Sequence, residues 1–323
     1  MGKDKLLKSG TLKTKISFPV IFGLFFSMGI ILSILCSCSK SDKVSVVISG
    51  STAMEKLVDV IAESYRVRNP RVTVTVEYTG SSAGIEAVLA QRADIGSSSR
   101  RLSAQEKALG AEETVAAIDG IVVIANVSNF SGEDTGLGIS DISGDTDSGD
   151  IWNHLDDSDN FEGINTLTTE QLRGIYTGKI RNWQEVGGED QVIVVVGREA
   201  GSGTRDTFEE MLELGDQCAY ANELDSTGAV LARVASTPGA IGYVSRDVLN
   251  DAGYGIRILA VDGCMPTDAN IADGSYQLTR PFLMVTKGPV REQKKEVQEL
   301  FAYLRSEEGR ELVRSVGLIV PGE

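Results

Sequence analysis

The chain has almost none of the histidine that most hydrolases and zinc sites need. Histidine occurs once in 323 residues, at His154. A Ser–His–Asp triad requires a histidine base, and zinc is bound by several histidines or clustered cysteines. The segment from Gly80 to Gly84 matches the G-x-S-x-G nucleophile elbow, but it lacks a convincing base. We therefore expect no catalytic residues, no cofactor and no metal, with a secreted phosphatase or serine hydrolase as the disfavoured alternative.

Cysteine is scarce as well, with four residues in the chain. Cys36 and Cys38 lie near the N-terminus, which leaves Cys218 and Cys264 in the body of the protein. These two could form a disulfide outside the cytoplasm, or both could be inert buried thiols. Sequence alone does not place them within bridging distance, so both alternatives stay open.

Positive charge is in deficit, because 31 lysines and arginines oppose 46 aspartates and glutamates. The formal net charge of −15 makes nucleic acid and anionic lipid headgroups poor partners. A small anion can still bind, because a cleft is governed by local dipoles and one or two cations rather than by net charge.

The N-terminus has the pattern of a secretory signal. Five lysines precede an apolar run from Ile16 to Leu35, and the next residues complete a Leu-Cys-Ser-Cys sequence that resembles a bacterial lipobox. We predict a lipoprotein signal peptide over 1–37, a lipidated Cys38 and a tether over 38–43. The protein would then lie on the extracytoplasmic face of a bacterial cytoplasmic membrane, held by its lipid anchor. An uncleaved transmembrane anchor is the alternative.

Strand patterns and helix patterns alternate after the tether. Apolar and β-branched runs predict strands over 44–48, 72–78, 118–127, 192–196 and 282–286. Apolar residues at helical spacing predict helices over 54–65, 85–90, 208–212 and 290–316, the last with a break at Gly309. Ser103 with Glu106, and Thr168 with Gln171, match the capping-box pattern. The alternation predicts an α/β fold.

One long segment interrupts this alternation. Residues 131–162 contain ten acidic side chains and little apolar periodicity, which predicts an acidic surface insertion. The run from Asp145 to Asp150 suggests calcium, but no register supplies the ligands of an EF-hand loop. A solvated acidic loop is the favoured interpretation.

Glycine and serine gather where strands give way to helices. The junctions are 49–53, 80–84, 96–99 and 201–204, and Arg198 stands just ahead of the last. Glycine lets the backbone approach a ligand, and the free N–H groups of a first helical turn attract anions. No lysine follows the last glycine, so this is not a nucleotide-binding Walker A loop. Four such junctions indicate an oxyanion site at the carboxyl ends of the strands.

With these residues assembled, the chain resembles the PstS-type phosphate-binding proteins of ABC transporters. The similarity runs from about Val44 to Gly322 and is most specific at 172–183, at 198–204 and at 238–244. The resemblance implies a two-lobed class II binding-protein fold whose hinge is crossed twice. Lobe I would comprise 44–126 plus 245–323, and lobe II would comprise 127–244. Phosphate would be held between lobes that close by a hinge motion.

The resemblance also implies the ligands and partners. Inorganic phosphate would contact a set of serine, threonine, glycine and arginine positions together with one alanine backbone, namely Ser51, Thr52, Ala53, Ser81, Arg198, Ser202, Gly203 and Thr204. We expect a monomer that delivers phosphate to ABC transporter permease subunits powered by a cytoplasmic ATPase. Sensing of phosphate, or binding of another oxyanion such as sulfate or molybdate, is the alternative.

Position 99 departs from part of this family. Ser99, which we also expect to contact phosphate, stands where some members carry an aspartate. Such a carboxylate can accept a hydrogen bond from the proton that phosphate keeps and sulfate lacks. Asp119 is our candidate for that acceptor, although it could equally be a turn aspartate. Arg100, next to Ser99, could be a second cation or a surface residue.

Overall fold

The computed structural model describes residues 43–126, 164–215, 217–251 and 255–322. The predicted signal peptide, Cys38, the acidic insertion over 131–162 and His154 all lie outside these residues. In the part of the chain that is described, no helix combines the length and apolarity required to cross a bilayer.

The fold is built on one mixed sheet, which confirms the predicted α/β class. The strands follow the order β2 (Val72–Tyr78), β1 (Val44–Gly50), β3 (Ile95–Ser98), β10 (Thr279–Lys287), β4 (Ala111–Asn126), β8 (Ala240–Ser245), β6 (Val194–Arg198) and β7 (Asn222–Leu224). β9 (Ile256–Val261) also pairs with β4, and β5 (Thr166–Leu167) pairs with β9. β1 is parallel to β2 and β3, and β6 is parallel to β7 and β8, whereas β10 and β4 run antiparallel to their neighbours.

Helices cover this sheet. The α-helices are α2 (Glu55–Arg68), α3 (Ser81–Leu89), α4 (Ala104–Ala108), α6 (Thr169–Tyr176), α7 (Gly203–Met211), α8 (Thr227–Ser236), α9 (Asp268–Ala272), α10 (Lys295–Leu304) and α11 (Glu307–Ser315). Short 3-10 turns are η1 (Thr52–Met54), η5 (Trp183–Val186), η6 (Arg246–Asp251) and η7 (Val290–Glu292). Both predicted capping boxes are confirmed, on α4 and α6.

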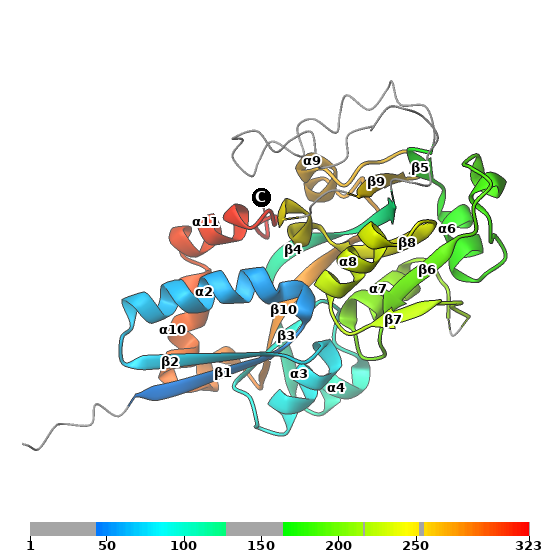
Figure 1. Ribbon diagram of the computed structural model, residues 1–323. Helices are drawn as coiled ribbons and strands as arrows, with labels where there is room; N and C mark the ends of the chain where they lie inside the picture. Colours follow the sequence, from blue (N-terminus) through cyan, green and yellow to red (C-terminus); the bar gives the residue numbers. More distant parts are fainter. Residues whose placement is uncertain (1–42, 127–163, 216, 252–254, 323) are drawn as a thin grey trace, which may run out of the picture. The chain divides into compact units, whose positions relative to one another are not determined.

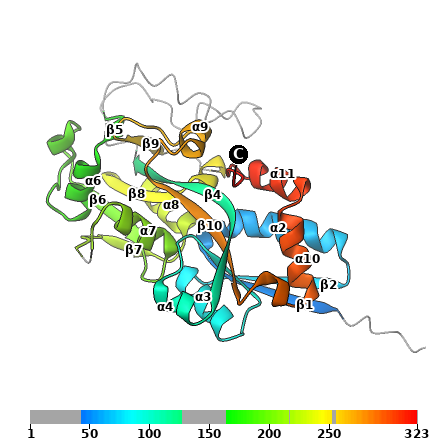
Figure 2. The same cartoon turned by 180° about the vertical axis from the view of Figure 1, so that it is seen from behind.

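β4 connects the two halves of the sheet. Its first part pairs with β10, and its last part pairs with β8 and β9. Figures 1 and 2 show β4 and β10 side by side, running from the strands β1–β3 toward β6 and β8. In this register Asp119 lies opposite Arg280 and Ile121 lies opposite Ser245. A bridge between Ile118 and Ile319 ties the C-terminal segment to the same place.

The apolar interior gathers in separate clusters on either side of this connection. The first packs β1 against α2, α10 and α11 and includes Ile48, Leu57 and Phe301. The second surrounds Trp183 and Phe208, and a third packs α8 against β4 and β8. Residues of β9, and the segment up to Leu278, join the second and third clusters. The lobe boundaries given above stay a prediction.

The predicted break at Gly309 is wrong. α10 ends at Leu304, and Ser306 starts α11 by accepting a hydrogen bond from the Gly309 N–H at 3.2 Å. Gly309 is instead needed for packing inside α11, because a Cβ there would lie 2.3 Å from the Tyr303 carbonyl oxygen. The predicted strand over 192–196 also begins later, at Val194, and Val192 is 67% exposed.

Gly309→Ala is expected to lower the free energy of unfolding by about 1–3 kcal/mol, because the added methyl group meets backbone that cannot rotate away. Gly228→Ala in α8 is the matched control, since a Cβ there has no neighbour within 4 Å. That control should be neutral or stabilising by up to about 1 kcal/mol. Urea denaturation of both variants measures the difference, and equal values would contradict the packing role of Gly309.

Candidate functional site

Three serine hydroxyl groups from different strand ends meet in the interior. Ser51 follows β1, Ser81 begins the helix after β2, and Ser99 follows β3. The Ser51 hydroxyl donates to the Ser99 Oγ at 2.9 Å, and the Ser81 Oγ lies 3.3 Å from the Ser99 Oγ. The Ser99 N–H also donates to the Ser81 Oγ at 3.1 Å. Each of the three residues is at most 3% exposed, so the sequence correctly placed them at one buried edge.

Gly203 closes on this serine cluster from the other half of the sheet. A Cβ at Gly203 would lie 2.3 Å from the Ser81 Oγ and 2.8 Å from the Ser99 Oγ. Nearby, the Ser82 N–H donates to the Gly201 carbonyl oxygen at 3.2 Å. The first turns of α3 and α7 therefore face each other across the cluster.

First helical turns supply partial positive charge here. Ser202 caps α7 by accepting a hydrogen bond from the Arg205 N–H at 3.4 Å. The N–H groups of Gly203 and Thr204 belong to the first turn of α7, where helix geometry provides no acceptor. Ala53 differs, because its N–H already donates to the Ser51 Oγ at 3.2 Å. These turns favour a small anion at the cluster.

Two threonine hydroxyl groups beside the cluster are buried without a partner. Within the described residues, neither Thr52 Oγ1 nor Thr204 Oγ1 makes a hydrogen bond, and the same holds for the Ser97 Oγ. Leaving a buried polar group unsatisfied costs about 1–3 kcal/mol. Unsatisfied groups of this kind indicate where a ligand or water binds.

Arg198 lies at the end of β6 and is 2% exposed. Its guanidinium donates to the Leu224 and Asp225 carbonyl oxygens at 3.1 and 3.2 Å and to the Thr227 Oγ1 at 3.1 Å. It also pairs with Glu199 at 3.0 Å. These contacts fix the orientation of Arg198, so its positive charge is already held in a buried position.

A buried ion pair lies behind the serine cluster. The Arg280 guanidinium donates to the Asp119 Oδ2 through Nε at 2.9 Å, and Nη2 lies 2.8 Å from the same oxygen. Asp119 Oδ1 accepts the Arg246 N–H at 3.1 Å. The Arg280 Nη1 also donates to the Ser99 carbonyl oxygen at 3.4 Å. The pair thus holds β10, β4 and the serine cluster together.

The surroundings of this pair shift the pKa values of both groups. Burial raises the pKa of the Asp119 carboxyl, whereas Arg280 and the Arg246 N–H oppose that change. Burial lowers the pKa of Arg280, and the nearby charge of Arg198 acts in the same direction. Two arginines therefore lie close enough to reinforce each other's attraction for an anion.

Arg100 crosses between helices instead of facing solvent. It pairs with Glu106 at 2.7 Å and with Asp206 of α7 at 3.0 Å, and it donates to the Ser82 Oγ at 3.0 Å. Its side chain is only 14% exposed. Neither expectation for Arg100 describes this arrangement, because its charge is neutralised within the protein. It links α4 and α3 to α7 beside the serine cluster.

A pocket of about 290 Å³ opens next to this region. Its walls come from η1, α2, α8 and the turn η6 after β8, through Thr52, Glu55, Lys56, Asp59, Gly228, Leu231, Asp247 and Val248. Asp247 is 1% exposed, and neither of its carboxylate oxygens has a hydrogen-bond partner in the described part of the chain. Burial, followed by the charge of Asp119, raises its pKa to about 7.

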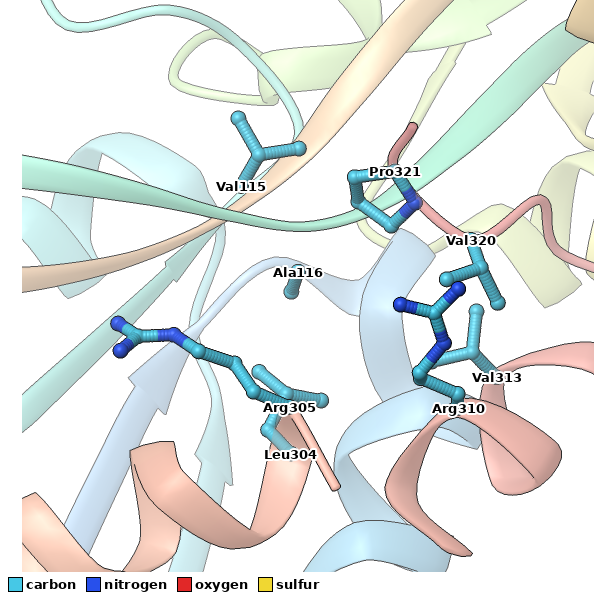
Figure 3. Close-up of a pocket in the computed structure, with 8 residues that line it drawn as sticks. All are labelled: Val115, Ala116, Leu304, Arg305, Arg310, Val313, Val320 and Pro321. Carbon is cyan, nitrogen blue, oxygen red and sulfur yellow. The ribbon is translucent and has the colours of Figure 1, made fainter. Parts of the chain in front are cut away.

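A second pocket, of about 230 Å³, is unrelated to the serine cluster. It lies between β4 and the C-terminal helices, and its lining is largely apolar apart from Arg305 and Arg310. Figure 3 shows the guanidinium groups of these two arginines pointing in different directions. They do not converge on a single anion.

Both cysteines of the body are free thiols, so the structure has no bond between Cys218 and Cys264. Burial raises the pKa of the Cys218 thiol to about 11, which keeps it protonated and unreactive at neutral pH.

Sequence reasoning missed two residues of this region. Arg280 was hidden at the start of an apolar strand, although a lone arginine there signals a buried ion pair. Asp247 is the second residue after the buried strand β8, and no local sequence pattern marks its carboxylate as unpaired. The other predicted residues are all buried, and the contacts above bring Ser51, Ser81, Ser99 and Gly203 together.

Known proteins resemble this chain over most of its length. Residues 38–308 match the PBP superfamily domain. The phosphate-binding protein PstS of Bacillus subtilis is 33% identical over 82% of this chain and 76% of that protein. The PstS of Borreliella burgdorferi is 26% identical over 89% of this chain and 94% of its own length.

Solved structures agree with these relatives. A putative phosphate ABC transporter substrate-binding protein from Clostridium perfringens, solved with bound phosphate, is 32% identical with a TM-score of 0.71, covering 85% of this chain and 98% of that one. An ABC-type phosphate transport receptor from Vibrio cholerae is 31% identical with a TM-score of 0.65, covering 85% and 100%.

Asp119→Asn is expected to lower the free energy of unfolding by about 3–5 kcal/mol, because it leaves the Arg280 charge buried and unpaired. The double variant Asp119→Leu with Arg280→Met should recover most of that loss, because two apolar side chains leave no buried charge without a partner. Glu86→Gln breaks an exposed pair with Arg92 and should cost less than about 1 kcal/mol. Denaturant unfolding compares them, and similar losses for Asp119→Asn and Glu86→Gln would contradict this role.

Proposed function

Because the chain belongs to the PBP superfamily, and within it to the PstS phosphate-binding proteins, we propose that it captures inorganic phosphate outside the cytoplasm for an ABC importer. The relatives named above are binding proteins by name, and we propose the same for this chain rather than an enzymatic activity. Delivery would be to permease subunits driven by a cytoplasmic ATPase, with the binding protein acting as a monomer.

The serine cluster with its glycine wall carries this proposal. A tetrahedral oxyanion needs several donors converging on a small volume, and Ser51, Ser81, Ser99 and the first turn of α7 supply such a volume. The unpartnered hydroxyl groups of Thr52 and Thr204 are further donors. Hydrogen bonds to a charged group contribute about 1.5–3 kcal/mol each, and micromolar affinity requires about 8 kcal/mol.

Positive charge behind the cluster supports an anion rather than a neutral ligand. Arg198 and Arg280 are both buried, and their charges are near enough to influence each other. On the strength of the resemblance to the PstS family, we propose that Arg198, Ser202 and the Ala53 backbone complete the binding site. Asp119 would act mainly by holding Arg280 in position.

Contacts across the cluster support a hinged closure. The Ser82–Gly201 hydrogen bond, the Arg100–Asp206 ion pair and the Thr207–Ser99 hydrogen bond at 3.2 Å all join the predicted lobes, 44–126 plus 245–323 and 127–244. We propose that these contacts form when phosphate binds and break when it leaves.

Calorimetry of the domain without its signal peptide should detect phosphate binding in the micromolar range or tighter. Arg198→Ala should weaken binding at least about tenfold, because a buried positive charge and a charge-assisted hydrogen bond of about 1.5–3 kcal/mol are lost. Gly203→Ala should weaken it as well, since the methyl group would occupy the space beside Ser81. Arg233→Ala, an exposed arginine of α8, is the matched control and should bind normally.

Melting temperatures would separate lost binding from lost folding in these variants. Absence of phosphate binding by the unaltered chain would refute the proposal. Tighter binding of sulfate or molybdate would show that the preferred ligand is that oxyanion and not phosphate. Turnover of a phosphomonoester would favour the enzymatic alternative.

The N-terminal sequence supports attachment to the membrane. We propose that residues 1–37 are cleaved and that a lipidated Cys38 retains the protein at the extracytoplasmic face. Cys38→Ser should abolish incorporation of a palmitate analogue and release the protein from the membrane fraction. Cys36→Ser is the matched control and should keep the label, whereas a labelled Cys38→Ser protein would refute anchoring at this cysteine.

A further inference from the structure

We propose that Arg205 is a positioning residue for phosphate binding, because it holds the loop over 198–204 in its binding shape before the ligand arrives. We call this loop the anion loop. It begins at Arg198, the last residue of β6, and contains Ser202 and Gly203 at the start of α7. The inference rests on the proposed phosphate binding and adds a residue that acts on the ligand only through its neighbours.

The Arg205 guanidinium reaches from α7 back to the strand that leads into the anion loop. Its Nη1 donates to the Arg198 carbonyl oxygen at 2.9 Å. The same nitrogen donates to Glu223 of β7 at 2.6 Å, and Nε donates to Glu209 of α7 at 2.8 Å. The Arg205 N–H donates to the Ser202 Oγ at 3.4 Å. Arg205 therefore contacts the anion loop at its first residue and again at the residue that caps α7.

A second set of hydrogen bonds holds the other side of the Arg198 backbone. The Arg198 N–H donates to the Tyr243 hydroxyl oxygen at 3.4 Å, and that oxygen lies 3.1 Å from the Tyr220 hydroxyl oxygen. The Tyr220 hydroxyl donates at 2.9 Å to the Glu209 Oε1, the oxygen that also accepts from Arg205. These bonds form a closed ring that leaves Arg198 through its N–H and returns through its carbonyl oxygen.

Aromatic packing stiffens this ring of hydrogen bonds. The Arg205 guanidinium lies over the Tyr220 ring, 4.9 Å from its centroid, where the face of the ring attracts the cation. Tyr243 stacks on Phe208, and their ring centroids are 4.0 Å apart. The Tyr220 ring lies directly against β6, because a Cβ at Gly197 would be 2.2 Å from its Cε1 atom. The chain thus places two aromatic rings and one arginine behind a single backbone position.

The ring of hydrogen bonds fixes the point from which the Arg198 side chain leaves β6. The contacts with Leu224, Asp225 and Thr227 described above fix its guanidinium at the far end. A loop that already has its binding shape loses little conformational freedom when the ligand arrives. A loop that has this shape only part of the time binds more weakly, in proportion to that fraction. Arg205 therefore raises the affinity without touching the anion.

Calorimetry of Arg205→Met tests this role, because methionine keeps an apolar stem and removes the planar fork of donors. Phosphate binding should weaken at least about tenfold, the effect of losing one charge-assisted hydrogen bond. Arg173→Met is the matched control. Arg173 of α6 also donates to a backbone carbonyl oxygen, that of Leu212 at 2.7 Å, and pairs with Glu213 at 3.0 Å, but at the opposite end of α7. This control should bind phosphate normally.

Hydrogen exchange of the ligand-free chain gives a readout that a purely structural role would leave unchanged. Peptides covering 198–206 should exchange at least about tenfold faster in Arg205→Met than in the unaltered chain, because the loop opens locally without its clamp. Peptides from β10, which Arg205 does not contact, should exchange at the same rate in both. Saturating phosphate should slow the exchange of 198–206 in the variant.

Arg205→Lys decides the question if Arg205→Met does not fold, because it keeps a positive charge between Glu209 and Glu223. An ammonium group lacks the planar fork, so we expect nearly normal stability together with faster exchange over 198–206 and weaker phosphate binding. Unchanged affinity, or unchanged exchange of the ligand-free loop, in the folded variants would overturn the inference and leave the proposed function intact. Failure of the unaltered chain to bind phosphate would instead overturn the proposed function.

Discussion

The ion pair between Asp119 and Arg280 joins the parts of this protein on which the site depends. The two residues lie opposite each other on β4 and β10, the strands that connect the halves of the sheet. Through Arg280 the pair reaches the Ser99 carbonyl oxygen, and through Asp119 it reaches the backbone after β8. Both ions are fully buried, so neither can be lost without leaving an uncompensated charge. The pair therefore fixes the distance between the serine cluster and the backbone after β8.

A chain of net charge −15 can hold an anion because charge is arranged locally. Arg100, whose charge is neutralised by Glu106 and Asp206, serves as a cross-link between helices. Arg198 and Arg280 each have an acidic partner and both are buried, and Arg280 also reaches the Ser99 carbonyl oxygen. First helical turns add partial positive charge without adding a titratable group. The acidic residues elsewhere on the surface have little influence at this distance, because solvent screens them.

The sequence predicted the contacts that follow from local rules. Ser51, Ser81 and Ser99 follow three parallel strands, and the carboxyl ends of parallel strands share one edge, so their convergence was foreseeable. The Asp119–Arg280 pair was not, because its members are 161 residues apart and β10 enters the sheet antiparallel between β3 and β4. Whether the Asp247 carboxylate is paired depends on which hydrogen-bond donors lie near it in the folded chain, and no local sequence pattern encodes that. Gly309 was misread because its close contact with the Tyr303 carbonyl comes from packing between helices rather than from a turn.

The missing side chain of Gly203 has a consequence for how this protein can change over generations. Every other amino acid carries a Cβ, and a Cβ here would overlap the Ser81 and Ser99 hydroxyl groups. No substitution at position 203 is therefore neutral, because each one adds a Cβ that disturbs the site. The serines and threonines around it offer the same kind of donor, so exchange between the two keeps a hydroxyl group in the site. Descendants of this protein would therefore keep this glycine while the residues around it change.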